Sequence, residues 1–339
     1  MRVGIVGAGI VGSATAAYLL RAGADVACFE AATPMSQRSA GSTRIFRLAH
    51  GAPALVDLAG RARSGYRRWG EEAGAELVDR TGVVVSGPEA EAWSRAMGAV
   101  GAECRLLDGL DLLGLHLPGP VLHDPAGGVL DADATGRYLT ARTAGALIPG
   151  QVEHLEHHGD AARVRTAAGH RDFDAVVIAA GAGTAALAAQ VGIGLPATTA
   201  HHVRFTFRLR DPAARPPCLL EGSLPLGTYQ HRAAPGLWAV GVHLPDDEVA
   251  WHVGRDVATA RAREATMRYV REHLAGVSGD PVDALYCSYP VGWGDGYVVV
   301  RAGRFLALHG DNLFKLAPVL GEILGEAALT GSTPVSHHA

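Results

Sequence analysis

Lysine is almost absent from this sequence of 339 residues. Of its 30 basic residues only one, Lys315, is lysine, and all the others are arginine. On a solvated surface the two residues differ little, so a composition rich in Ala, Gly and Arg loses every lysine that arginine can replace. A lysine that remains indicates a place where a compact charge on a flexible stem is needed. We therefore interpret Lys315 as a site residue; the alternative is chance.

Long apolar runs and an excess of positive charge are also absent. No run reaches the roughly eighteen apolar residues of a membrane span. The net charge is −4 and the arginines are scattered, which argues against a basic surface for nucleic acid. With 48% hydrophobic and 19% charged residues, the chain has the composition of a globular protein with one large core or two domains. These features favour a small molecule as the partner.

Cysteine is scarce, and no two cysteines form a C-x-x-C pair. The four residues are Cys28, Cys104, Cys218 and Cys287. Such wide spacing is typical neither of a disulfide framework nor of a zinc site, so we predict no metal and a reducing cytoplasm. Within the apolar residues 1–20, three glycines lie between positions 7 and 12; they would weaken the helix of a signal peptide, which favours a phosphate-binding turn instead. We expect a monomer or a small homo-oligomer.

The first thirty residues predict a βαβ unit. Residues 2–6 form an apolar run, an Ala-rich helix is expected over residues 13–22, and a second apolar run covers residues 25–29. A crossover of this length joins parallel, buried strands. The chain therefore begins as a Rossmann-type domain.

Later segments divide between this domain and a second one. The Rossmann-type pattern of buried strands and a helix returns later in the chain, with apolar runs at residues 175–179, 297–300 and 305–308 and an expected helix over 318–329. A different pattern is seen between them: residues 202–209 and 236–244 alternate between apolar and polar, and an amphipathic helix is expected over 257–274. We predict an α/β protein with a Rossmann-type FAD-binding domain and an inserted α+β, mainly antiparallel-sheet substrate domain. The expected boundaries are 1–80, 145–200 and 281–339 for the first and 81–144 and 201–280 for the second.

A glycine turn joins the first strand to the first helix. Gly7, Gly9 and Gly12 supply the tight turn, the close approach to a pyrophosphate and the close helix contact. Glu30 ends the second strand, where a carboxylate accepts hydrogen bonds from an adenosine ribose. The combination predicts a dinucleotide without a 2′-phosphate, although it does not separate NAD from FAD.

Four further segments, in order along most of the chain, decide between the two. They are Gly41-Ser-Thr-Arg-Ile-Phe-Arg47, Gly236-Leu237 with Gly241-Val-His243, Tyr286-Cys-Ser-Tyr-Pro290, and Phe314-Lys315 followed by Gly321-Glu322 and Leu329-Thr-Gly331. Together they resemble the D-amino-acid oxidase superfamily of FAD enzymes, and within it the monomeric sarcosine oxidase and N-methyltryptophan oxidase group.

The resemblance implies bound FAD, attached through a thioether from Cys287. The alternative interpretation of Cys287 is a free cysteine that packs as a small buried hydrophobic residue. It also implies that Arg44 lies near the flavin ring, and that the helix after Pro318 directs its positive end to the flavin pyrimidine. The predicted cofactor-binding residues are Gly7, Gly9, Gly12, Glu30, Ser39, Ser42, Thr43, Arg44, Val152, Gly181, Cys287, Gly310, Asn312, Leu313, Phe314 and Lys315.

The same resemblance implies a carboxylate clamp made of Arg47 and Lys315. A bidentate guanidinium and a point charge suit an amino-acid carboxylate. Tyr289 corresponds to a substrate-side tyrosine, with an ordinary strand aromatic as the alternative, and Tyr229 and His231 lie near the position of another. We count Tyr229 and Tyr289 as substrate-binding, and Arg44, Arg47, Lys315 and Tyr289 as catalytic. An exposed helix face is the alternative interpretation of Arg44 and Arg47, which are three residues apart.

One position departs from the family pattern. Where the family has a lysine that promotes reaction of reduced flavin with oxygen, this sequence has Ala239. Either another cation replaces it, such as Arg44 or a protonated His201, His202 or His243, or electrons leave by another acceptor. His243 could equally be a buried core residue.

We predict oxidation of a C–N bond by hydride transfer to flavin, giving an imine, with O2 as acceptor and H2O2 as product. Cyclic imino acids, N-methyl amino acids and unusual amino acids of secondary metabolism all suit the carboxylate clamp. The alternatives are a dehydrogenase of the same fold with another acceptor, and a flavin-binding subunit that needs a partner chain.

Overall fold

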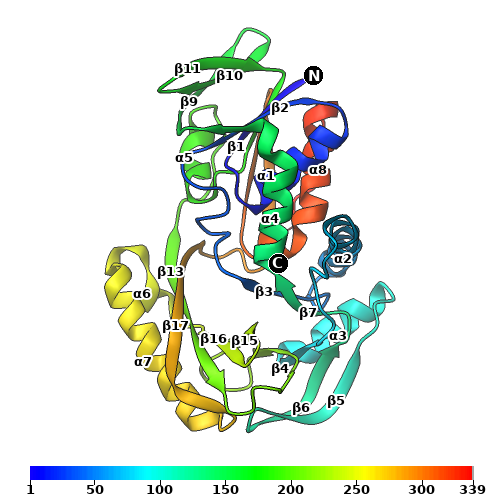
Figure 1. Ribbon diagram of the computed structural model, residues 1–339, viewed down its shortest axis with the longest axis vertical. Helices are drawn as coiled ribbons and strands as arrows, with labels where there is room; N and C mark the ends of the chain where they lie inside the picture. The colour runs from blue at the N-terminus through cyan, green and yellow to red at the C-terminus, as the bar shows by residue number, and fades with distance from the viewer. Residues whose placement is uncertain (338–339) are drawn as a thin grey trace. The chain divides into compact units, whose positions relative to one another are not determined.

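The computed structural model describes residues 1–337, and the chain divides into two compact units (Figure 1). Unit 1 comprises Met1–Ala40, Ala134–Thr198 and Pro290–Ala339. Unit 2 comprises Gly41–Asp133 and Thr199–Tyr289.

Unit 1 is built on a six-stranded sheet in the order β18-β19-β12-β1-β2-β8. All neighbouring strands are parallel except β18 and β19, which are antiparallel. Its elements are β1 (Arg2–Val6), α1 (Ile10–Arg21), β2 (Asp25–Glu30), α4 (Ala132–Thr143, from Ala134 onward), β8 (Leu147–Pro149), β9 (Val152–His158), β10 (Ala161–Thr166), β11 (Gly169–Phe173), β12 (Ala175–Ile178), α5 (Thr184–Ala189), β18 (Tyr297–Ala302), β19 (Phe305–Gly310) and α8 (Ala317–Thr330). This arrangement confirms the predicted Rossmann-type domain.

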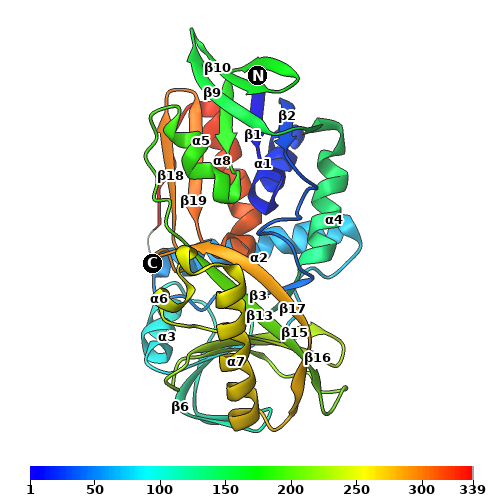
Figure 2. The same ribbon diagram turned by 90° about the vertical axis from the view of Figure 1, so that its left-hand side faces the viewer.

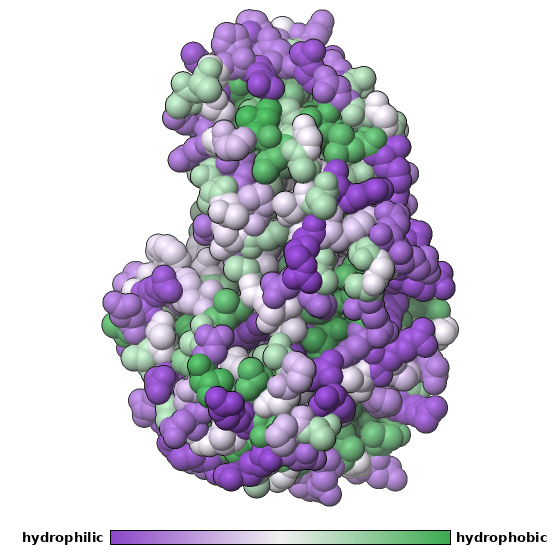
Figure 3. All heavy atoms as spheres, viewed as in Figure 1, coloured by the Kyte–Doolittle hydropathy of each residue, from purple (hydrophilic) through white to green (hydrophobic). Residues whose placement is uncertain are grey.

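Different elements cover the two faces of this sheet. Helices α1 and α8 pack closely together along one face (Figure 2). Against the other face pack α5 and the small antiparallel sheet β9-β10-β11, through a core that includes Phe29, Leu155, Val164 and Phe173. Mostly hydrophilic side chains surround the small sheet at the top of Figure 3. The six-stranded sheet is therefore buried on both faces, which explains its continuous apolar runs.

Unit 2 is built on an eight-stranded sheet in the order β17-β13-β16-β15-β14-β4-β6-β5. Strands β13 and β16, β16 and β15, β15 and β14, β4 and β6, and β6 and β5 pair antiparallel, whereas β14 and β4 are parallel. Its elements are β3 (Thr43–Phe46), α2 (Pro53–Ala73), β4 (Val83–Ser86), α3 (Glu89–Ala99), β5 (Arg105–Leu112), β6 (Leu115–Asp124), β7 (Gly128–Asp131), β13 (Thr199–Leu209), β14 (Cys218–Glu221), β15 (Thr228–Ala234), β16 (Leu237–Val242), α6 (Asp246–Val249), α7 (Arg255–His273) and β17 (Val277–Pro290). The predicted antiparallel second domain is present.

The central strands of this sheet have one apolar and one polar face. On the apolar face, Phe205, Phe207, Trp238 and Val240 pack in a core with α7. Side chains alternate along a strand, so the intervening residues lie on the opposite face. We call this the polar face of unit 2; it carries His202, Arg204 and Thr206 of β13, Tyr229 and His231 of β15, and Ala239 and Gly241 of β16.

The boundaries of the units differ from those expected. Residues 41–80 belong to unit 2, and residues 134–144 belong to unit 1. The reason is that β3 pairs with β7, which lies more than eighty residues later in the chain. Cys287 and Tyr289, expected with the first domain, also belong to unit 2.

Candidate functional site

The glycine turn lies between β1 and α1. Gly7 has φ +99°, and a Cβ there would come within 2.6 Å of the Ala179 carbonyl oxygen. Gly12 lies inside the first turns of α1, where a Cβ would be 1.9 Å from the carbonyl oxygen of Gly7. Gly7 therefore serves the tight turn and Gly12 the close contact of the helix with that turn, which are two of the three glycine roles in a dinucleotide-binding cradle. The helix begins at Ile10, three residues earlier than predicted.

Glu30 and Ser39 both meet this turn. The Glu30 carboxylate accepts hydrogen bonds from the backbone N–H of Ala8 at 2.7 Å and of Ala32 at 2.9 Å. The Ser39 hydroxyl accepts one from the N–H of Ile10 at 3.0 Å. The predicted residues therefore hold the turn in place, and their fit to FAD rests on the cradle and this acidic strand end.

The other predicted cofactor residues of unit 1 lie where strands of the main sheet end. Gly181 follows β12 with φ +57°, and Gly310 is the last residue of β19. Parallel strands place their carboxyl ends at one edge, so these residues share an edge with Gly7 and Glu30. Val152, which begins β9, lies in the core between the six-stranded sheet and the small sheet β9-β10-β11 rather than at this edge.

The segment after β19 forms a tight turn and a 3₁₀ helix, Leu313–Leu316. Asn312 adopts a left-handed conformation, with φ +52°, and its side-chain amide donates to the Gly294 carbonyl at 3.2 Å. Beside it, Asp311 forms an ion pair with Arg38 at 2.7 Å, and burial raises the pKa of this carboxyl. No motif in the sequence marks Arg38 or Asp311 as site residues.

Lys315 is buried, with 5% of its surface exposed, and forms an ion pair with Asp295. Lys315 is therefore not a surface lysine that arginine could replace without effect. Asp295 was not identified from the sequence, because it lies twenty residues away in a loop with no motif. Lys315 thus has a fixed carboxylate partner before any substrate binds.

Arg47 lies directly after β3 and is 7% exposed. Its guanidinium donates to the carbonyl oxygen of Ala49, contacts His50 Nδ1 at 3.0 Å and stacks 4.8 Å from the Trp93 ring centre. Arg44 lies within β3 and is half-buried. The alternative of an exposed helix face is therefore wrong for both arginines.

The surroundings of Arg44 bring together several predicted residues of unit 2. Burial lowers its pKa to about 10, and the nearby charge of Arg204 lowers it further. Cys287 and Tyr229 act on the same guanidinium electrostatically in the opposite sense. Cys287 is a half-buried thiol in β17, and it does not form a disulfide within the described chain.

The two predicted tyrosines meet at His202 on the polar face of unit 2. Tyr229 Oη lies 2.7 Å from His202 Nε2, and the Tyr289 ring stands edge-on to the imidazole with centres 6.0 Å apart. The Tyr229 ring lies across Gly241, where a Cβ would be 2.2 Å from the ring. Gly241 is therefore required for the position of Tyr229.

His202 and His243 do not replace the charge that is missing at Ala239. Desolvation lowers the pKa of His202 to about 3, and the charges of His243 and Arg204 add to this effect. Desolvation also lowers the pKa of His243. Both side chains are therefore neutral at ordinary pH, and the suggestion that either one supplies a cation is not supported.

A cation that sequence analysis missed lies next to this position. Ala239 pairs with Thr206 on one side and with His231 on the other. Arg204, two residues before Thr206, places Nη1 2.8 Å from His231 Nε2 and is 7% exposed. Only the strand alternation of β13 could have placed Arg204 on this face, and no motif marked it.

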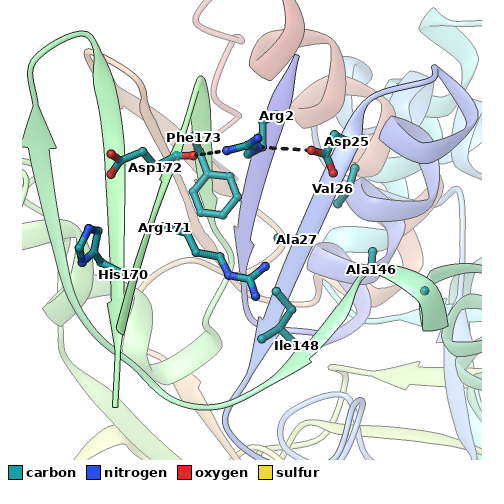
Figure 4. Close-up of a pocket in the computed structure, with 11 residues that line it drawn as sticks. Arg2, Asp25, Val26, Ala27, Ala146, Ile148, His170, Arg171, Asp172 and Phe173 are labelled. Carbon is teal, nitrogen blue, oxygen red and sulfur yellow. Dashed lines mark hydrogen bonds and ion pairs between the residues drawn. The ribbon is translucent and has the colours of Figure 1, made fainter. Parts of the chain in front are cut away.

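A pocket of about 650 Å³ in unit 1 lies away from these residues (Figure 4). It is lined by the first residues of β1 and β2, where Arg2 and Asp25 form an ion pair at 3.3 Å, and by Arg171, whose side chain points toward Ile148. The glycine turn follows the opposite ends of the same strands. None of the predicted site residues lines this pocket.

Comparisons with known proteins agree with this arrangement. N-methyl-L-tryptophan oxidase from Salmonella heidelberg (strain SL476) is 27% identical over 97% of this chain and 95% of that protein. The open form of NikD, an unusual amino acid oxidase essential for nikkomycin biosynthesis, superposes with a TM-score of 0.82 at 21% identity, over 99% of both chains. L-proline dehydrogenase from P. horikoshii superposes with a TM-score of 0.80 at 16% identity, over 98% of this chain and 94% of that one.

No helix within residues 1–337 is long and apolar enough to cross a membrane.

The family of FAD dependent oxidoreductases abbreviated DAO matches residues 2–327, nearly the whole chain. This match confirms the predicted superfamily and the predicted cofactor. The chain therefore belongs to the DAO family of FAD-dependent oxidoreductases and is a flavoenzyme.

Proposed function

We propose that this enzyme oxidises the C–N bond of an amino acid, an N-methyl amino acid or a cyclic imino acid to an imine. Bound FAD would supply the chemistry by accepting a hydride from the carbon next to the amine nitrogen. The protein would contribute orientation and electrostatics. The observation that carries the proposal is the burial of Arg47 and Lys315, two cations at the positions that match the family's carboxylate-binding residues.

The family resemblance assigns both cations to the substrate carboxylate; Arg47 belongs to unit 2 and Lys315 to unit 1, and each is described within its own unit. Lys315 is held by Asp295, so a carboxylate would have to share or displace that partner. Arg47 is oriented by the Ala49 carbonyl and by stacking on Trp93. Such pre-oriented donors lose little side-chain entropy on binding.

The polar face of unit 2 favours a neutral amine. His202 and His231 are neutral because burial lowers the pKa of each, and the neighbouring Arg204 is positively charged. A positive field raises the cost of an ammonium group, so it lowers the pKa of a bound amine. The amine then carries the free lone pair that assists hydride loss, without a side chain acting as general base.

For the electron acceptor we propose O2, with H2O2 as product. Negative charge develops on oxygen as it is reduced, and a fixed buried cation stabilises that charge. Arg204 lies beside Ala239, where the family has lysine, and is the candidate for this role. A dehydrogenase that uses another acceptor is the second candidate, since the fold is shared with L-proline dehydrogenase.

We also propose that Cys287 carries the flavin covalently. The thiol is half-buried in β17 and lies within electrostatic reach of Arg44. The test is acid precipitation of the wild type and of Cys287→Ser, with Cys104→Ser as the control. Visible flavin should stay in the pellet for the wild type and the control, and pass into the supernatant for Cys287→Ser. Release from all three would contradict covalent attachment.

The test of the activity is a panel of substrates with parallel assays of O2 consumption and H2O2 formation. Consumption of one O2 and formation of one H2O2 for each imine would support an oxidase. Flavin reduction by a substrate without O2 consumption, followed by reoxidation with a quinone or dye, would favour the dehydrogenase.

The cytoplasmic location and the oligomeric state remain predictions from the sequence.

A further inference from the structure

Arg204 is buried in unit 2 with an incomplete set of partners. Its Nη1 donates to the Thr43 carbonyl oxygen at 3.0 Å and to His231 Nε2 at 2.8 Å. Within residues 1–337, Nε is buried without an acceptor, Nη2 makes no hydrogen bond, and no carboxylate pairs with the guanidinium. Buried charges are normally paired, because removing them from water is costly. The charge of Arg204 is therefore poorly compensated by this part of the chain.

His231 cannot compensate that charge. Arginine only donates hydrogen bonds, so Nε2 of His231 must be the acceptor and the ring proton must be on Nδ1. Nδ1 is buried without an acceptor in normal hydrogen-bonding geometry, although the Thr43 carbonyl faces the ring. Burial holds the pKa of His231 well below its usual value, and the charges of Arg204 and Arg44 add to the effect. The imidazole thus adds a second unsatisfied donor.

A second guanidinium shares the acceptor of the first. Arg44 Nη1 donates to the Thr43 carbonyl at 2.8 Å, the same oxygen that Arg204 uses. A Cβ on Gly41 would lie 3.1 Å from Arg44 Nη1 and 3.5 Å from Arg204 Nη2, so the two groups approach each other at this glycine. Burial lowers the pKa of Arg44 most, and the charge of Arg204 lowers it further by repulsion. An anion placed against both would relieve this repulsion.

We infer that Arg204 and Arg44 form a binding site for a small monovalent anion on the polar face of unit 2. The open donor is Arg204 Nη2, which, unlike Nε, is not sealed by protein atoms. The ligand chemistry is that of a carboxylate or a halide. Its source is either a carboxylate of the substrate or a free small anion. The site is independent of the proposed clamp, because neither Arg47 nor Lys315 contributes to it.

Formate is the probe, and the readout is the melting temperature of the FAD-loaded protein. A ligand that binds only the folded state raises this temperature in proportion to the logarithm of its concentration above Kd. Arg208→Met is the matched control, because Arg208 lies on the same strand and the same face but is exposed. Wild type and Arg208→Met should show the same rise with formate. Arg204→Met should show none.

Arg204→Lys keeps the charge and tests the planar fork. It should bind formate about tenfold more weakly than the wild type, because a flexible ammonium replaces the Nη2 donor that the planar guanidinium holds in place. It also carries the test if Arg204→Met does not fold. An equal rise in all four proteins, or no rise in the wild type, would overturn the anion site.

Steady-state kinetics then identifies the source of the anion. If formate raises only the apparent KM, and Arg204→Lys weakens this competition, a carboxylate of the substrate occupies the site. If the melting shift remains at saturating substrate and KM is unchanged by formate, a free anion occupies it. Both outcomes support the site, and neither depends on which acceptor the flavin uses.

Discussion

Arg204 and His231 are twenty-seven residues apart in the chain, yet Nη1 of the arginine lies 2.8 Å from Nε2 of the histidine on the polar face of unit 2. This contact places a fixed charge next to Ala239 and holds the imidazole in one neutral tautomer. The site therefore combines a permanent cation with neutral rings, and its response to mutation and pH follows from that combination.

Arg204→Met should slow reoxidation of the reduced enzyme by O2. Loss of a fixed buried charge that stabilises the developing anion by about 1.4 kcal/mol corresponds to about tenfold in rate. The reductive half-reaction should change less. Stopped-flow measurement of each half-reaction checks this, with Arg208→Met as the control. An unchanged rate of reaction with O2 would remove Arg204 from the oxidative step.

Lys315→Met should raise the apparent KM for a carboxylated substrate at least about tenfold while leaving the flavin content intact, because a charge-assisted hydrogen bond to the substrate is lost. The variant also leaves Asp295 without its ion-pair partner. The double variant Lys315→Met, Asp295→Asn removes that carboxylate and its repulsion of the substrate. A KM that returns to the wild-type value in the double variant would show that Lys315 does not bind the substrate.

Gly241→Ala should displace Tyr229. The new Cβ would lie 2.2 Å from the tyrosine ring, so the ring must move and its hydrogen bond to His202 is lost. We expect a loss of roughly 1–3 kcal/mol of stability, as for other overpacked sites. Gly60→Ala is the control, since a Cβ at Gly60 meets nothing within 4 Å in the middle of α2. That substitution should stabilise the protein by up to about 1 kcal/mol. Equal melting temperatures for the two variants would contradict the packing of Tyr229 on Gly241.

Acidification should destabilise unit 2 through His202. Its pKa is about 3 in the folded protein against 6.5 for the unfolded group, so between these values the unfolded chain binds one more proton. The free energy of unfolding then falls by up to about 1.4 kcal/mol for each pH unit below the unfolded pKa. Above the unfolded pKa both states bind the same number of protons at this residue, so acid no longer reduces the free energy of unfolding through His202. His231, whose pKa is also lowered, acts in the same direction.

His202→Gln removes this proton uptake and can still hydrogen-bond to Tyr229. Its melting temperature should therefore fall less steeply than that of the wild type between about pH 7 and about pH 5. Substitution of the exposed His252 by Gln is the control for loss of a histidine elsewhere in unit 2. Parallel pH dependences for wild type and His202→Gln would show that His202 titrates normally.

Local patterns predicted the parts of the fold that depend on neighbours in sequence. The strand at residues 2–6 was predicted with its observed bounds, and α7 and α8 were predicted to within two residues at either end. The first helix begins at Ile10 and not at residue 13, because Gly12, which the glycine motif puts in the turn, lies within the helix.

Long-range pairing could not be predicted in the same way. The boundary near residue 41 depends on β3 pairing with β7, and the position of Arg204 depends on the register of three strands. Asp295 has no motif and is recognisable only once its contact with Lys315 is known. Sequence motifs therefore identified the cofactor turn and the family, whereas the electrostatic partners of the cations required the folded chain.

The most direct test of the proposed activity is anaerobic titration of the FAD-loaded protein with N-methyl amino acids, cyclic imino acids and ordinary amino acids, followed by visible absorption. We predict that at least one of these compounds bleaches the oxidised flavin completely, that the corresponding compound without a carboxylate does so far more weakly, and that admission of O2 restores the colour. A flavin that stays oxidised with every compound of all three classes would contradict the account.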